Sequence, residues 1–104
     1  MKVYHKLVRD RIPEIIAASG KKCVTEVMSD ADYIAALDTK LEEELHEYYE
    51  DHSIEELADL LEVLRACAVA RGYTLEQLEA VRAEKAAKRG AFEKKLLLKE
   101  VDDK

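Results

Sequence analysis

Nine of the twenty residues in KLEEELHEYYEDHSIEELAD, residues 40–59, are Asp or Glu. Acids three residues apart lie on one side of a helix, and the segment contains such pairs in both of its halves, among them Glu44 with Glu47, and Glu56 with Asp59. Carboxylate oxygens are hard ligands that suit Mg²⁺ or Mn²⁺ better than Zn²⁺. Four carboxylates brought together repel one another unless a cation joins them, so the pattern predicts a divalent metal site.

Two helices must position these acids. The leucine spacing predicts a long helix from about residue 30 to residue 50 and a second from residue 53 to about residue 71. The connection at residues 51–53 is so short that the helices must be antiparallel neighbours. With the turn centred in this connection, residues at one height of the hairpin pair as Glu44 with Asp59 and Glu47 with Glu56.

A helical wheel separates these four acids from others in the same helices. It puts the four at the edges of the two apolar stripes, whereas Glu55 and Glu62 fall on the solvated side. The competing interpretation is a solvated acidic face without a ligand. Under that interpretation, Glu56 serves only in a capping box that begins at Ser53.

The rest of the chain predicts further helices in a single domain, residues 1–104. Residues 9–19 read as a helix capped by Asp10, and residues 74–90 as a helix opened by the capping box TLEQ. Residues 22–28 alternate enough to predict a short strand, which residues 96–101 could pair with. The expected fold class is all-α, a helical bundle built on the central antiparallel hairpin and completed by dimerisation, with at most a small β element.

Composition limits the partners. The formal net charge of −6 argues against a nucleic acid polymer, whose phosphates need a basic face. We expect no membrane association and a cytoplasmic location, because the chain shows no signal-peptide core and no apolar run of spanning length. Cys23 and Cys67 match no metal or redox spacing. The apolar arcs cover about half of each wheel, more than one partner helix covers, which predicts a homodimer or a dimer of dimers.

The acidic motifs also resemble the motifs of a known protein superfamily. Residues 43–47, EELHE, followed by ELAD at residues 56–59, resemble the EExxE and ExxD motifs of the all-alpha NTP pyrophosphatase superfamily, MazG type, to which phosphoribosyl-ATP pyrophosphohydrolase is related. The opening YHKLVRDRIPEII and the segment EKAAKRGAFEKKLLL resemble the two ends of a subgroup of small stand-alone MazG-like proteins. One departure is visible, since only residues 48–55 separate the two motifs, which is short for the family.

The resemblance implies a hydrolase. Glu44, Glu47, Glu56 and Asp59 would be the catalytic, Mg²⁺-binding acids, and the ion would help water attack the α-phosphorus of a nucleoside triphosphate. The products would be a nucleoside monophosphate and pyrophosphate, with house-cleaning of unwanted nucleotides as the role. Glu43 is expected to be solvated, with a supporting role beside the metal as the alternative. The expected substrate contacts are Lys40, Lys85, Lys88 and Arg89.

Several alternatives stay open at this point. Phosphoribosyl-ATP hydrolysis in histidine biosynthesis would use the same acidic motif, and a non-catalytic helical dimerisation or adaptor module would use none of it. Basic residues at the end of the helix at 74–90 also complement the helix dipole without any ligand. A second basic group, Lys6, Arg9 and Arg11, is compatible with packing, surface pairing or substrate contact.

Overall fold

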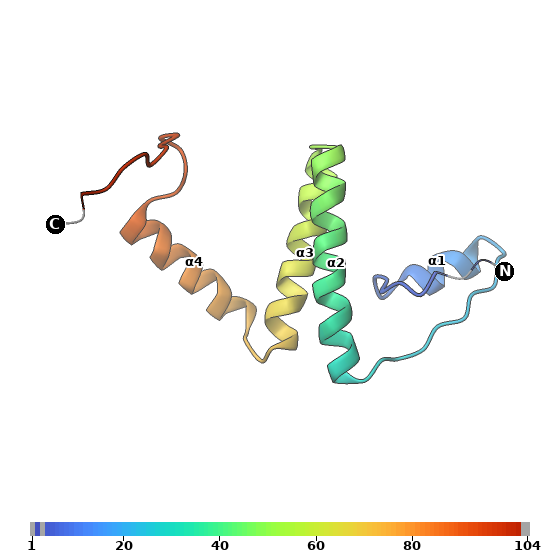
Figure 1. Ribbon diagram of the computed structural model, residues 1–104. Helices are drawn as coiled ribbons and strands as arrows, with labels where there is room; N and C mark the ends of the chain where they lie inside the picture. Colours follow the sequence, from blue (N-terminus) through green and yellow to red (C-terminus); the bar gives the residue numbers. More distant parts are fainter. Residues whose placement is uncertain (1, 3, 103–104) are drawn as a thin grey trace.

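The computed structural model describes residues 2 and 4–102. Four helices follow one another: α1 (Ile12–Ala18), α2 (Asp30–Glu50), α3 (Ile54–Ala70) and α4 (Leu75–Arg89). No residue within this described part lies in a strand, so the all-α prediction is confirmed. Figure 1 shows α2 and α3 side by side at the centre of the molecule, with α1 on one side of them and α4 on the other.

The hairpin of α2 and α3 forms as predicted, and a serine caps the start of each helix. Ser29 Oγ accepts a hydrogen bond from the backbone N–H of Asp32 (3.2 Å), and Ser53 Oγ accepts one from that of Glu56 (3.3 Å). Each bond satisfies a backbone donor that the first helical turn leaves free. The connection is tightened by the Ser53 N–H, which donates to the carbonyl of Asp51 at 2.8 Å.

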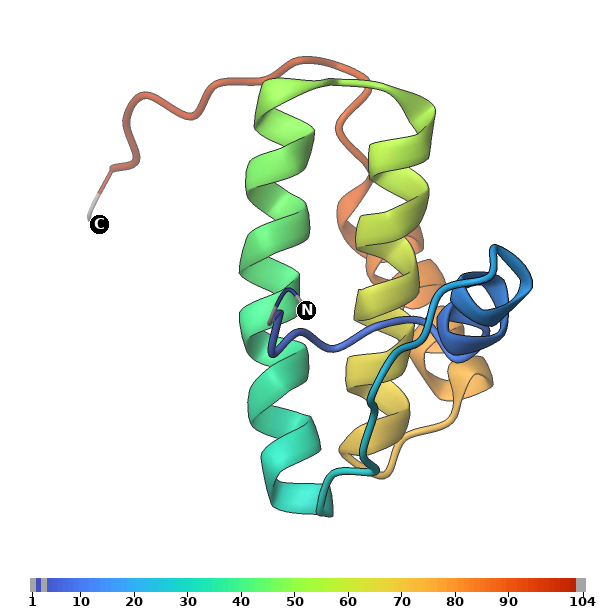
Figure 2. The same cartoon turned by 90° about the vertical axis from the view of Figure 1, so that its right-hand side faces the viewer.

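Helix α4 begins with the predicted capping box. The Thr74 hydroxyl accepts from the backbone N–H of Gln77, whose side chain accepts from the backbone N–H of Thr74. Before α4, Gly72 has a φ of +93°, a left-handed conformation that glycine adopts without steric cost. Figures 1 and 2 show α4 leaning away from the hairpin on the side opposite α1 and the N-terminal segment.

Two local predictions are wrong. Helix α1 starts later than expected, with Arg11 at its N-cap and no side-chain cap bond, so Asp10 does not cap it. Residues 22–28 and 96–101 do not form strands, and the two segments lie on opposite sides of the hairpin in Figure 1. A strand needs a neighbour for its backbone hydrogen bonds, and alternation alone does not provide one.

A single chain buries very little. Among the described residues, Leu37 is the one buried hydrophobic residue, at 3% exposure, and Glu44 is the one buried charged residue. The molecule extends over 64 × 31 × 23 Å. Large apolar side chains on α3, α4 and the C-terminal tail stay open to water, among them Leu57, Leu61, Leu64, Leu78, Val81, Phe92 and Leu96. No helix of the described chain is both long and apolar enough to cross a membrane.

We expect the purified chain to associate with itself at micromolar concentration, because apolar surface of this extent is covered in stable proteins. Multi-angle light scattering should give at least twice the mass of one chain. Leu61→Glu, on the exposed stripe of α3, should shift the population towards monomer. Val24→Glu, at an exposed site outside the helices, is the matched control and should not. A monomeric parent chain would contradict this expectation.

Candidate metal centre

The hairpin brings acids from both helices together. One group of carboxylates consists of Glu44 from α2 with Glu56 and Asp59 from α3, whose ligand oxygens all lie within 4.8 Å of one another. A second group lies along α2 and meets the same distance criterion: Glu43, Glu44 and Glu47. Glu44 belongs to both groups, so it stands at their centre. The predicted pairing of Glu44 with Asp59 across the hairpin is therefore found.

Glu44 is the unusual member because it is buried, with only 6% of its surface exposed. Its Oε1 lies 3.4 Å from Lys40 Nζ, whereas its Oε2 is buried without a hydrogen-bond partner among the described residues. Glu56 Oε2 is in the same situation. Burying a carboxylate oxygen without a donor or a cation is costly. These two oxygens therefore mark the point where the hairpin lacks positive charge.

The electrostatics agree with the burial. Loss of hydration raises the pKa of Glu44 above its ordinary value, and the negative charge of Glu47 adds to the rise, while Lys40 opposes it. The pKa of Glu56 is raised as well, first by loss of hydration and then by the charges of Glu47 and Asp59. Both shifts express one condition, namely that the charged carboxylates are crowded and under-compensated.

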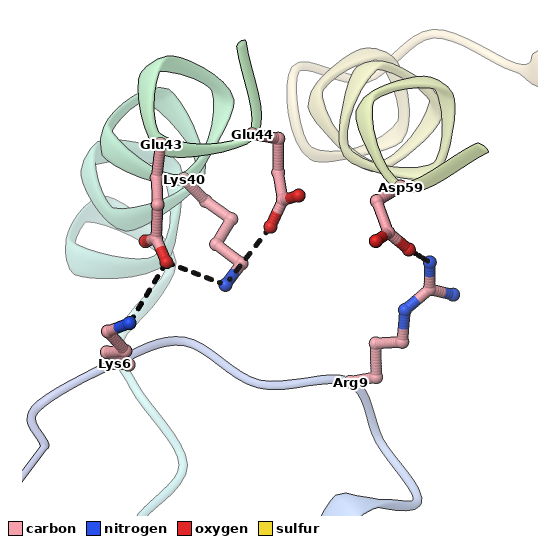
Figure 3. A network of polar contacts seen from close by, with 6 residues as sticks. All are labelled: Lys6, Arg9, Lys40, Glu43, Glu44 and Asp59. Atoms are coloured by element: carbon pink, nitrogen blue, oxygen red, sulfur yellow. Dashed lines mark hydrogen bonds and ion pairs between the residues drawn. The ribbon is translucent and has the colours of Figure 1, made fainter. Parts of the chain in front are cut away.

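Three cations partly balance the acids (Figure 3). Lys6 Nζ donates to Glu43 Oε1 at 3.1 Å, and Arg9 Nη2 donates to Asp59 Oδ1 at 2.7 Å. Lys40 lies between its two neighbours on α2, 3.5 Å from Glu43 and 3.4 Å from Glu44. The hydrogen bond from Lys6 lowers the pKa of Glu43, with Lys40 assisting.

The local charge is suited to a divalent ion. Five carboxylates in the two groups face three cations, which leaves two negative charges. A divalent cation would neutralise these two negative charges, and the partnerless oxygens of Glu44 and Glu56 could coordinate it. Oxygen donors of this kind fit Mg²⁺ or Mn²⁺, which retain bound waters and open positions for phosphate oxygens. The donor set therefore fits the ion expected from the sequence.

The exposure of the other acids agrees with the sequence predictions only in part. Glu47, which the wheel put at the edge of the apolar stripe, is exposed and joins the group on α2. Glu55 and Glu62 are exposed on α3, as the wheel predicted. Glu43 is not the solvated residue we expected, because it is partly buried and paired with Lys6 and Lys40.

Lys40 lies at the acids, but the basic residues of α4 do not. Lys85, Lys88 and Arg89 line a hollow on α4 with Val81 and Glu84, and Lys88 pairs with Glu84 at 2.8 Å. Within the residues that the structure describes, no ion pair joins these three cations to the acids of the hairpin. Their contact with substrate stays a prediction.

Arg9 and Lys6 are the residues whose position the sequence did not reveal. A signal existed, since three basic residues within six positions are conspicuous in an acidic chain. That signal could not indicate which helix they reach, because Arg9 and its partner Asp59 are fifty residues apart.

The comparisons with known proteins add little to this site. No protein-family model matches the chain, and no solved structure matches it. An uncharacterized protein of Mycolicibacterium smegmatis is 60% identical over 42 residues. The match covers 40% of this chain and 43% of that protein, so it shows similarity over a segment and assigns no activity.

The burial of Glu44 predicts a reversal of stability by metal. In EDTA, Glu44→Gln should melt a few degrees above the parent, because the amide removes a crowded buried charge while keeping the volume. With Mg²⁺ in excess, the order should reverse, since an ion that binds only the folded parent stabilises it by mass action. Differential scanning calorimetry of both proteins in both buffers measures the effect.

The control for this experiment is Glu55→Gln, an exposed acid on α3, which should follow the parent in both buffers. The advantage of Glu44→Gln in EDTA should also shrink as the pH falls through the raised pKa of folded Glu44, and it should be gone below the ordinary glutamate value of about 4.3. The folded-state pKa of Glu44 is raised, so the cost of its charge is present at neutral pH and disappears on protonation. Equal melting temperatures in EDTA at neutral pH would show that Glu44 is not an electrostatic liability.

Proposed function

We propose that this chain is a Mg²⁺-dependent nucleoside triphosphate pyrophosphohydrolase of the MazG type that removes unwanted nucleotides. The observation that supports it best is Glu44, a buried carboxylate shared by two acid groups and left with a partnerless oxygen. A glutamate that served only as surface charge would have no reason to be buried in this way. The motif resemblance supports the same proposal from the sequence, because Glu44, Glu47, Glu56 and Asp59 occupy the positions of the family's acids.

When bound, the ion would act as a Lewis acid that polarises the phosphate oxygens and the attacking water. Glu44, Glu56 and Asp59 would hold it between the two helices. The exposed Glu47 lies beside Glu44 and can accept the proton of the attacking water. The water oxygen forms a bond to the α-phosphorus, the bond from that phosphorus to the bridging oxygen breaks, and pyrophosphate leaves with the bridging oxygen.

The proposal includes a second copy of the chain. In Figures 1 and 2, α4 lies on the side of the hairpin opposite the N-terminal segment, whose cations contact the acids. Lys85, Lys88 and Arg89 of one chain therefore cannot easily serve its own acids. The exposed apolar stripe of α3 would bring the second copy close, and its α4 could then supply phosphate contacts.

An adaptor without catalysis is the second candidate, and the exposed apolar surface favours it. The adaptor candidate predicts that the chains associate with one another whether or not the acidic residues are intact. Phosphoribosyl-ATP hydrolysis is a substrate variant of the main proposal, so it requires the same carboxylates and differs only in the nucleotide.

The activity itself should appear as release of pyrophosphate in a screen of normal and modified NTPs and dNTPs, with phosphoribosyl-ATP included. Glu56→Gln and Asp59→Asn should reduce the rate at least 100-fold, because a neutral amide is a poor ligand for Mg²⁺. Glu55→Gln and Glu62→Gln should retain the parent rate. If the two sets of variants behave alike, the four acids are not the metal ligands. If the parent chain releases no pyrophosphate from any of these nucleotides, the adaptor is favoured.

Mixing two impaired variants, at a substrate concentration too low to saturate either of them, tests the contribution of a second copy. Lys88→Glu should weaken substrate binding with little change in melting temperature, because Lys88 is an exposed residue. If acids and cations come from different chains, mixing Lys88→Glu with Glu56→Gln creates hybrid dimers that each contain one intact site. Random mixing of a two-fold dimer then restores roughly a quarter of the parent activity. A mixture that stays as inactive as its components would contradict the shared site.

A further inference from the structure

The N-terminal segment before α1 crosses the acidic side of the hairpin. Figure 2 shows it running from α2 towards α3, and Figure 3 shows two of its side chains reaching different helices. Lys6 contacts Glu43 on α2, and Arg9 contacts Asp59 on α3. The two cations therefore lie on either side of the buried Glu44.

These ion pairs are poorly explained as stabilising contacts. The side chains of Lys6 and Arg9 are 52% and 58% exposed, and exposed pairs contribute little to folding because water screens them. Weakly held pairs are also easily exchanged for others. Arg9 in particular occupies an oxygen of Asp59, which belongs to the carboxylate group that fits a metal. A metal at that group would meet the positive charge of the guanidinium beside Asp59.

The same two side chains are suited to phosphate. A guanidinium presents parallel N–H donors to phosphate oxygens as it does to a carboxylate, and an ammonium binds phosphate as a point charge. A divalent ion bound at Asp59 would supply the positive charge that Arg9 now supplies there and would release the guanidinium, whereas Lys6 still balances Glu43 until phosphate arrives. A triphosphate arriving at that ion brings new negative charge to the place where Lys6 and Arg9 lie.

We propose that Lys6 and Arg9 form a phosphate-binding site that exchanges partners. They neutralise Glu43 and Asp59 in the metal-free chain, and they transfer to the phosphate oxygens of the nucleotide when a divalent ion binds the carboxylates. This inference rests on the proposed metal site. It assigns a ligand class, the polyphosphate of a nucleotide, to a segment outside the acidic motifs.

Arg11 provides a matched control within the same segment. It has the same side chain as Arg9, lies two residues further along, and pairs with Glu14 of α1 at 3.2 Å. Its charge is therefore directed to α1, away from the acids. Arg11→Ala changes the net charge as Arg9→Ala does, so a comparison of the two variants separates the specific contact from general electrostatics.

The test is two titrations by calorimetry, first with Mn²⁺ alone and then with inorganic triphosphate added to the Mn²⁺-loaded chain. Arg9→Ala should bind Mn²⁺ more tightly than the parent, by about threefold or more, because a competing cation is gone. It should bind triphosphate about tenfold more weakly, because charged hydrogen bonds to phosphate are lost. Lys6→Ala should change both affinities in the same directions, Arg9→Lys should lie between parent and Arg9→Ala, and Arg11→Ala should match the parent.

Opposite shifts of the two affinities are the signature of exchange, and a merely structural role would not produce them. If Arg9→Ala leaves both affinities at the parent values, or weakens both together, the exchange is overturned while the metal site stands. If the parent chain itself binds no Mn²⁺, the proposed function fails and the exchange fails with it. Circular dichroism confirms the helix content of each variant, and Arg9→Gln is a second substitution that keeps a polar side chain.

Discussion

A buried negative charge at the contact of two helices is the constraint on which this structure depends. Glu44 is almost fully enclosed, and one of its oxygens has no donor in the described chain. The surrounding features all bear on that charge. The three-residue connection fixes the register that brings Glu56 and Asp59 to its level, and Lys40 supplies one positive charge from the preceding turn. Under the proposed function, a divalent ion would satisfy these carboxylates together.

The acidic seam also limits how the fold is stabilised. Carboxylates occupy positions along the hairpin where apolar side chains would otherwise complete a core, and Leu37 is the one hydrophobic residue that the described chain buries. The caps at Ser29, Ser53 and Thr74 define the helices but do not bury apolar surface. The stability of the hairpin should therefore depend on a second chain for its apolar stripes and on cations for its acids. Under this account, assembly, metal binding and substrate binding are linked by the same two helices.

Much of the architecture follows from local rules. Serine and threonine caps gave the starts of α2, α3 and α4, and the short connection made their antiparallel order and the level of Glu44 and Asp59 predictable. The misassignments had non-local causes. The strand predicted at residues 22–28 does not form, because no partner strand lies beside it and an alternation pattern cannot provide one. The contact of Arg9 with Asp59 depends on how the N-terminal segment returns across the hairpin, and nothing near Arg9 in the sequence encodes that path.

The central claim is that Glu44 is buried because a divalent ion belongs beside it, and a crystal grown with Mn²⁺ tests this most directly. Anomalous diffraction should show a Mn²⁺ peak between α2 and α3, with oxygens of Glu44, Glu56 and Asp59 at about 2.2 Å, as expected for a hard divalent cation. Arg9 should then have left Asp59. A crystal soaked in millimolar Mn²⁺ with no peak at the hairpin, and with Arg9 still bonded to Asp59, would contradict the account.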